Sequence, residues 1–289
     1  MSLSIQLLRG PVNAALLTAP DGTLYLVDPG LDDNAGRRVL RTAGAEAVAA
    51  TLLTHAHADH GGAAAWLRRK TGCTVYAPRL ELPWVVQGGL LPASFWGAAA
   101  PPEYTGKFLA PEGTPAEALE AAAIPGLVPI PLPGHSPGHT GFSVGRTLIC
   151  GDAIFPQEVL DKHGLPLFFD VDAARGTLAF LQEEAGRRWD SFCPGHGSPL
   201  DADSLRAAAQ ANLTRLGEVD DCLLEALSAG PRRDDELTRT ALERFSLSPF
   251  QPWLLLLCQC AVRGHLTGLS RKNLITQDGG ALWPAWYRA

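Results

Sequence analysis

Apolar and polar residues alternate along the first two hundred positions in a way that predicts strands and helices in turn. Short β-compatible runs at 23–27 and 49–54 each stop at a turn or a polar residue, and helical patterns follow at 34–42 and 61–70. Further strands are predicted at 74–77, 127–132, 142–150 and 190–193, with a helix at 173–186. This order predicts an α/β fold in layers, with the helices outside the sheets.

Two segments depart from this alternation. The first, 84–126, is rich in Gly, Pro and Ala and contains five aromatic residues: Trp84, Phe95, Trp96, Tyr104 and Phe108. A long irregular insertion of this kind is usually a lid or a binding loop, so we expect it either to cover a site with apolar surface or to fill a small core of its own.

The second segment is the C-terminal tail, where the pattern becomes mainly helical. Helices are predicted at 202–227, 234–246 and 249–268, followed by a polar turn at 276–280 and a strand at 281–283. The change of pattern places a domain boundary near residue 215, which divides the chain into 1–215 and 216–289.

Composition and charge narrow the classes of function. The chain has 289 residues, of which 46% are hydrophobic and 19% charged, as expected for a soluble globular protein with a large core. Its formal charge of −6 argues against general binding to nucleic acid or to an anionic membrane. The six cysteines form no CxxC pair, and we find neither a signal peptide nor a membrane-length apolar run. We therefore expect a cytoplasmic protein.

The most informative motif is His55-Ala56-His57-Ala58-Asp59-His60, directly after a predicted strand and before a predicted helix. His55 and His57 are two positions apart, so an extended backbone directs both to one side. Asp59 and His60 fall where the chain turns and can face a neighbouring position, and the glycines at 61 and 62 permit a tight bend. Four metal-binding side chains within six residues predict a metal site at the end of a strand.

Three later segments place the same kinds of side chain after strands. Segment 132–140 contains His135 and His139, segment 148–152 ends at Asp152, and segment 192–197 contains His196. Alone, each would more simply be a hydrogen-bonding turn residue. Together with the first motif they indicate one convergent site. Imidazole and carboxylate groups are ligands of zinc, and iron and manganese use the same ones.

These motifs resemble, in order, those of the metallo-β-lactamase superfamily: HxHxDH at 55–60, PGHSPGHT at 133–140, GD at 151–152 and GH at 195–196. The resemblance implies an αβ/βα sandwich, with one metal held by His55, His57 and His135. It implies a second metal held by Asp59, His60 and His196, and Asp152 as the bridge between the two ions. Because true β-lactamases lack this bridging aspartate, the pattern is more similar to the glyoxalase II branch.

The resemblance also implies a chemistry. Two zinc ions, or iron or manganese in their place, would share a hydroxide that attacks a carboxylic ester, thioester or lactone of a small, partly apolar substrate. Asp59 and His139 are the residues we assign to catalysis, and His139 is expected to orient a ligand or the substrate from behind the metals. The simpler alternative for His139 is a turn histidine bonded to backbone. Asp28, after the strand at 23–27, is expected either to support the site or to form an Asx turn.

The tail, 216–289, loosely resembles the small winged-helix appendage of some superfamily members, including endoribonucleases. Its basic and acidic residues nearly balance, so nucleic-acid binding is disfavoured and we expect a structural or dimer-forming role. The alternatives to an ester or thioester hydrolase are an endoribonuclease and a mononuclear iron persulfide dioxygenase.

Overall fold

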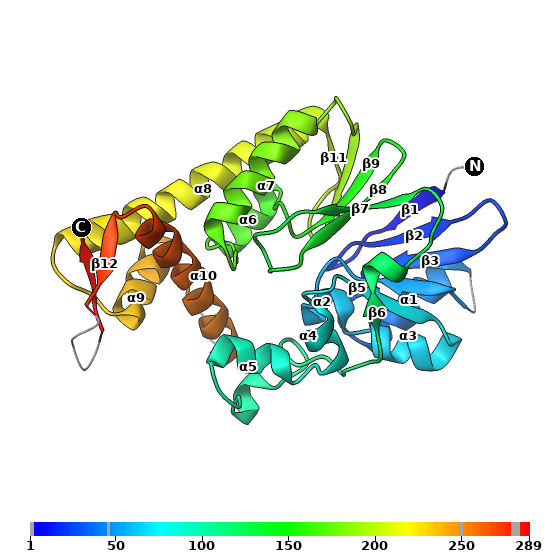
Figure 1. The fold of residues 1–289 in the computed structure, drawn as a ribbon, viewed down its shortest axis with the longest axis horizontal. Coiled ribbons are helices and arrows are strands. Elements are labelled where there is room, and N and C mark those ends of the chain that lie inside the picture. The colour runs from blue at the N-terminus through cyan, green and yellow to red at the C-terminus, as the bar shows by residue number, and fades with distance from the viewer. Residues whose placement is uncertain (1–2, 45–46, 249–250, 279–283) are drawn as a thin grey trace.

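The computed structural model describes residues 3–44, 47–248, 251–278 and 284–289, and its centre is a pair of mixed sheets (Figure 1). The first sheet has six strands in the order β1 (Ser4–Leu8), β2 (Ala14–Thr18), β3 (Leu24–Val27), β4 (Ala50–Leu52), β5 (Thr74–Ala77) and β6 (Glu117–Ala118). Its first three strands are antiparallel and the rest join in parallel. The hairpin of β1 and β2 was not predicted from the sequence.

The second sheet has five strands, in the order β11 (Leu200–Asp201), β10 (Ser191–Pro194), β9 (Thr147–Gly151), β8 (Thr140–Val144) and β7 (Leu127–Pro131). Only β9 and β10 pair in parallel. Buried side chains of the two sheets form one core, in which Leu17, Val27 and Leu52 pack with Phe142 and Ile149. The expected sandwich is therefore confirmed.

Helices cover the outer face of each sheet. On the first sheet, α1 (Asp33–Ala43) and α3 (Ala64–Thr71) bury Val39 and Leu67 against strand residues that include Leu26. On the second, α7 (Val171–Glu184) and α8 (Ala202–Ser228) bury Leu178 and Leu205. The helix predicted at 61–70 corresponds to α3, which begins three residues later than predicted, and a further short helix, α2 (Ala58–Gly61), precedes it.

The C-terminal region is mainly helical. Helix α8 continues without a break through residue 215, and its second half packs with α9 (Asp234–Arg244) and α10 (Pro252–Arg271) (Figure 1). A two-stranded sheet of β12 (Ile275–Gln277) and β13 (Trp286–Arg288) completes the region. The strand expected at 281–283 lies outside the described residues, and the winged-helix likeness and the boundary at 215 stay predictions.

The insertion at 84–126 is more ordered than its composition predicted. It contains most of α4 (Leu82–Val86), all of α5 (Leu90–Trp96), 3₁₀ turns at Pro102–Tyr104 and Leu119–Ala121, and β6. Between these elements, Phe108 stacks on Trp253 of α10, with ring centroids 5.1 Å apart and planes 11° from parallel. The insertion therefore reaches the C-terminal region. No helix among the described residues is long and apolar enough to cross a membrane.

Candidate metal centre

The side chains singled out by the sequence motifs meet at one edge of the sandwich. His55 follows β4, and His57 directly precedes α2, which contains Asp59 and His60. The second sheet contributes His135 from the loop after β7, Asp152 after β9 and His196 after β10. Both sheets thus supply ligand-type side chains from the ends of their strands, as the motif positions predicted.

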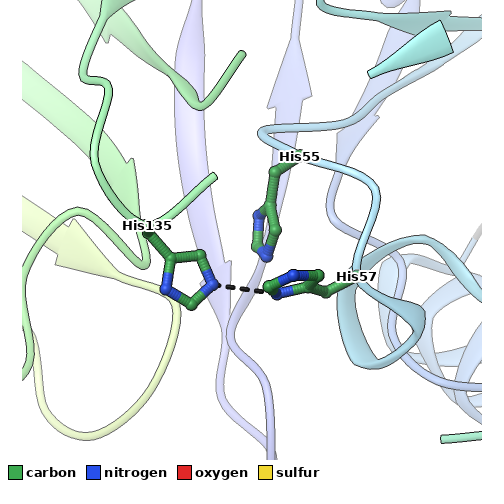
Figure 2. A group of neighbouring side chains, drawn as sticks. All are labelled: His55, His57 and His135. Carbon is green, nitrogen blue, oxygen red and sulfur yellow. Dashed lines mark hydrogen bonds between the residues drawn. The ribbon is translucent and has the colours of Figure 1, made fainter. Parts of the chain in front are cut away.

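The ligand atoms fall into three overlapping groups, each with its atoms within 4.8 Å of one another: His55, His57 and His135; His55, His60 and Asp152; and Asp59, His60 and His196. Figure 2 shows the first group, in which three imidazoles converge from two sides. Within it, Nε2 of His135 lies 2.9 Å from Nδ1 of His57. The first and third groups are the two triads expected from the sequence.

Asp152 lies between these triads. Its carboxylate oxygens are 3.3 Å from Nε2 of His60, 3.5 Å from Nε2 of His135 and 3.5 Å from Nε2 of His196. Asp59 is on the His196 side, with its carboxylate 3.3 Å from Nε2 of that imidazole. A side chain that contacts members of both triads has the position required of a bridging ligand.

The outer nitrogen of each of four histidines is anchored to the protein. Nδ1 of His60 donates to Asp28, Nδ1 of His135 to the carbonyl of Leu167, and Nδ1 of His196 to the carbonyl of Pro11. Since Thr54 Oγ1 donates to Asp28, Nδ1 of His55 donates to Thr54 Oγ1. Such bonds fix the ring and direct the other nitrogen, Nε2, to the centre.

Several of the inward-facing atoms are buried and have no hydrogen-bond partner, namely Nε2 of His55, Nε2 of His60 and Oδ1 of Asp152. Buried polar atoms are nearly always satisfied, so each exception needs a cause. A set of imidazole and carboxylate atoms that converge without partners is suited to a divalent cation such as zinc. The residues present therefore fit the metals that the motif implies.

Asp28 supports the site and does not merely form a local turn. It is buried, accepts from His60 Nδ1 at 2.9 Å, and accepts from the backbone N–H and the hydroxyl of Thr54 at 2.8 and 2.7 Å. The residue adopts a positive φ of 49°, a strained conformation that is tolerated where it serves a functional arrangement. Asp28 thereby connects the end of β3 to Thr54, directly before the first motif, and to His60 at its end.

Glu81 has a comparable role that the sequence did not reveal. Its fully buried carboxylate accepts from Ala56 N–H at 3.1 Å, from the Ser136 hydroxyl at 2.7 Å and from Gly138 N–H at 2.7 Å. These donors belong to the loop of His55 and His57 and to the loop of His135. Glu81 therefore ties together the two loops that supply the first triad.

His139 lies behind Asp152, away from the open side of the centre. Its Nε2 accepts the backbone N–H of Asp152 at 3.0 Å, and the ring is 1% exposed. Burial lowers the pKa of this imidazole to about 3, so it remains neutral and can accept that bond. This contact gives His139 a means of positioning Asp152.

At two positions only glycine fits, because a Cβ atom would clash with its neighbours and not because the backbone needs a positive φ. Gly62 has ordinary helical angles, but a Cβ there would lie 1.9 Å from the carbonyl oxygen of Leu31. The chain turns here between α2 and α3, and the glycine is needed because any Cβ would clash, as the motif predicted. At Gly195 a Cβ would lie 2.2 Å from Oδ1 of Asp152 and 2.6 Å from Cε1 of His60. The glycine therefore leaves space beside these two side chains.

The three imidazoles of the first triad are neutral at ordinary pH. Burial lowers the pKa of His57 to about 4 and that of His135 to about 3. Burial, with four neighbouring imidazoles, also lowers the pKa of His55 well below its usual value. Neutral imidazole is the form that binds metals, so this side of the centre is ready to receive an ion.

The second triad has the opposite electrostatics. Burial alone would lower the pKa of His196, but Asp152 and Asp59 raise it to about 10. For His60 the effect of burial is likewise outweighed by Asp152, Asp59 and Asp28, which raise its pKa well above the usual value. In the metal-free protein these rings hold protons where a cation would otherwise balance the carboxylates.

Two cavities open onto the centre. The larger, of about 560 Å³, is lined by His57, Asp59, His135, Asp152 and His196 and also by apolar residues of α5, α6 (Gln157–His163) and α10. The smaller, of about 380 Å³, shares His57 and His135 with it and extends toward Arg263 and Arg271 of α10. Phe95 of the insertion lines both, 5.9 Å from the His57 ring. The insertion thus covers the centre with apolar surface.

Comparison with known proteins agrees with this geometry. The family model for the metallo-beta-lactamase superfamily matches residues 7–221. A hydroxyacylglutathione hydrolase of Shewanella baltica (strain OS155) is 30% identical over 274 residues, which cover 92% of this chain and 90% of that protein. The probable metallo-hydrolase YflN of Bacillus subtilis is 28% identical, covering 68% and 84%. The chain belongs to the metallo-β-lactamase superfamily, in a glyoxalase II-like branch, and is an enzyme of the metal-dependent hydrolase class.

Solved structures show the same fold. A metallo-β-lactamase family protein of Thermus thermophilus superposes with a TM-score of 0.73 at 20% identity, covering 100% of this chain and 99% of that one. TTHA1623, solved in a di-iron-bound form, is 31% identical with a TM-score of 0.52, covering 71% of this chain and 98% of its own. The first match extends through the C-terminal helices, which are therefore part of a recurring arrangement.

Proposed function

We propose that the protein hydrolyses a thioester, or a related ester or lactone, of a small and partly apolar substrate with two divalent metal ions. The observation that carries this proposal is the geometry of the seven side chains, which form two triads with Asp152 between them. Among the three bonds we favour the thioester, because relatives named hydroxyacylglutathione hydrolase match over most of the chain.

In this proposal His55, His57 and His135 hold one ion, Asp59, His60 and His196 hold the other, and Asp152 bridges them. When bound, such ions lower the pKa of water to supply a nucleophile at neutral pH and polarise a carbonyl oxygen. Zinc fits the imidazole and carboxylate set, and iron or manganese fits the same ligands.

The protein's own residues position the reaction. Asp28 and Glu81 hold the ligand-bearing loops, and His139 holds the backbone of Asp152. Phe95 and other apolar residues line the cavity next to the centre and give the reacting position a largely apolar wall. Asp59 lines this cavity, and its carboxylate lies 3.3 Å from Nε2 of His196 beside the reacting position. It is therefore placed to receive the proton released when water attacks the acyl carbon.

The proposal is tested by incubating metal-loaded protein with acyl thioesters and measuring the released thiol. Wild-type protein should release thiol with turnover, and Asp59→Ala should lower kcat by at least about a hundredfold, since even groups behind metal ligands contribute about 10–100-fold. Asp203→Ala, an exposed acid on α8, serves as the matched control with unchanged kcat.

Other results would overturn the assignment. Cleavage of single-stranded RNA by the same preparation, abolished in Asp59→Ala and without thioester turnover, would make the protein an endoribonuclease. Oxygen uptake with a persulfide, together with one iron per chain, would make it a persulfide dioxygenase. We expect neither activity.

A further inference from the structure

The larger cavity has an apolar wall far more extensive than the metal centre itself requires. One end is the centre, and the opposite wall comes from three segments that are distant in sequence: α5, the stretch around Phe108, and the first half of α10. Its volume of about 560 Å³ lies within the range of sites that enclose drug-sized ligands, roughly 300–1,000 Å³. A small acyl group would leave most of this space unfilled.

Helix α10 lines the cavity with apolar side chains that are not fully buried in the protein core. Leu254 and Leu257 line the cavity while only partly buried, and Trp253 lines it while stacking on Phe108. Leu255, on another side of the same helix, lines neither cavity and is 36% exposed. Contiguous apolar side chains that remain accessible usually mark a binding surface.

We propose that this wall binds an extended apolar acyl chain, so that α10 selects the length of the chain whose ester or thioester bond is cleaved. This inference rests on the proposed function. The carbonyl of the substrate would lie at the metal centre and the chain would extend past Phe95 toward Leu257. Water adds its oxygen to the acyl carbon, the C–S or C–O bond breaks, and the thiol or alcohol leaves with a proton beside the carboxylate product.

The smaller cavity leaves a route for the other part of the substrate. It shares His57, Phe95 and His135 with the larger one, so the two cavities adjoin at the reacting position. The apolar chain and the leaving group therefore need not share one space. This arrangement permits a long chain without blocking the departure of the thiol or alcohol.

Binding is tested on the full-length protein, as isolated and after chelator treatment, with butanoate, octanoate and dodecanoate in a calorimeter. The dissociation constant should fall by about fourfold for each added methylene until the cavity is full, the effect expected for burial of one methylene. Leu257→Trp should weaken octanoate binding at least about tenfold by occupying the cavity, whereas Leu255→Trp should match wild type. Leu254→Trp provides a second blocking variant if Leu257→Trp does not fold.

The outcomes separate the two proposals. Affinity independent of chain length, or equal effects of Leu257→Trp and Leu255→Trp, would overturn the acyl-chain assignment even if thioesters are hydrolysed. Length-dependent binding that Leu257→Trp alone weakens would support the acyl-chain site even if no thioester is hydrolysed, a result that would remove the proposed function and the selection of a cleaved chain. With activity present, Leu257→Trp should also lower the ratio of kcat/KM for octanoyl to butanoyl thioesters.

Discussion

At the scale of single residues, the position of Gly195 shows how little space the centre allows. Gly195→Ala would place a methyl group against the Asp152 carboxylate and the His60 ring. We expect the variant to lose most of its bound metal and about 1–3 kcal/mol of stability from overpacking. Gly217→Ala on α8, where no atom lies near the added methyl, should retain its metal and gain about 0.5–1 kcal/mol. Normal metal content in Gly195→Ala would show that the space beside Asp152 and His60 is not the metal site.

A substitution at Glu81 tests whether its hydrogen bonds hold the two loops that carry the first triad. Glu81→Ala leaves the Ala56 N–H, the Ser136 hydroxyl and the Gly138 N–H without their acceptor. Buried donors without an acceptor lower the free energy of unfolding. Burial raises the pKa of Glu81, so removing its buried charge offsets part of this loss. We therefore expect the free energy of unfolding to fall by about 1–3 kcal/mol. Chemical denaturation measures the loss, with the exposed Glu117→Ala as control. Metal affinity should also fall, and equal behaviour of the two variants would contradict this role.

The raised pKa values of His60 and His196 predict that protons and metals compete. The pKa of His196 is raised to about 10, so this ring holds a proton at pH 7 in the metal-free protein and must lose it to bind metal. The neighbouring carboxylates raise the pKa of His60 in the same direction, so a proton on that ring also opposes metal binding. Affinity should therefore fall with falling pH, by about tenfold per pH unit for each proton displaced, and the displacement of the His196 proton should persist up to about pH 10. Calorimetry in buffers of different ionisation enthalpy should count between one and two protons released. No proton release would contradict the assigned charges.

The residues that the sequence revealed and those that it hid differ in a physical way. The histidines and aspartates of the centre occur in dense motifs at strand ends, so local spacing indicates metal binding. Glu81 has no such neighbours, and it contacts the centre only because α4 packs beside two loops far from it in sequence. The close approach of Leu31 to Gly62 is similarly invisible without the fold.

At the scale of elements, the hairpin of β1 and β2 escaped prediction because its residues have weak strand propensity. The β2 sequence, AALLT, shows no alternation of polar and apolar residues, since four of its five positions are buried. The insertion was also misjudged as irregular, because its Gly and Pro residues obscure the short α4 and α5. Its aromatic residues nevertheless indicated the apolar cover that the structure places over the centre.

The contact between the insertion and α10 should be energetically measurable. Phe108 and Trp253 stack in nearly parallel planes, and aromatic pairs of this kind contribute about 0.5–1.5 kcal/mol beyond the area that they bury. A double-mutant cycle of Phe108→Ala and Trp253→Ala, followed by denaturant unfolding, should give a coupling energy in this range. The stacked pair Trp96 and Tyr104, which lies within the insertion, offers a comparison. Strict additivity of Phe108→Ala and Trp253→Ala would show that the insertion does not bind α10 through these rings.

At the scale of the whole molecule, the metal centre joins the two sheets, and the cavity joins the sandwich to the C-terminal helices. Neither triad comes from one sheet alone: His135 completes the first from across the sandwich, and His196 completes the second. Bound metals should therefore stabilise the entire fold, because only the folded chain brings these ligands together.

The central claim is that seven converging side chains hold a pair of ions, and metal content tests it most directly. Elemental analysis of purified, metal-reconstituted protein should give two divalent ions per chain, reduced in Asp152→Ala, which lacks the proposed bridge between the triads. A wild-type content of one ion or none, or two ions retained with unchanged affinity in Asp152→Ala, would contradict the account.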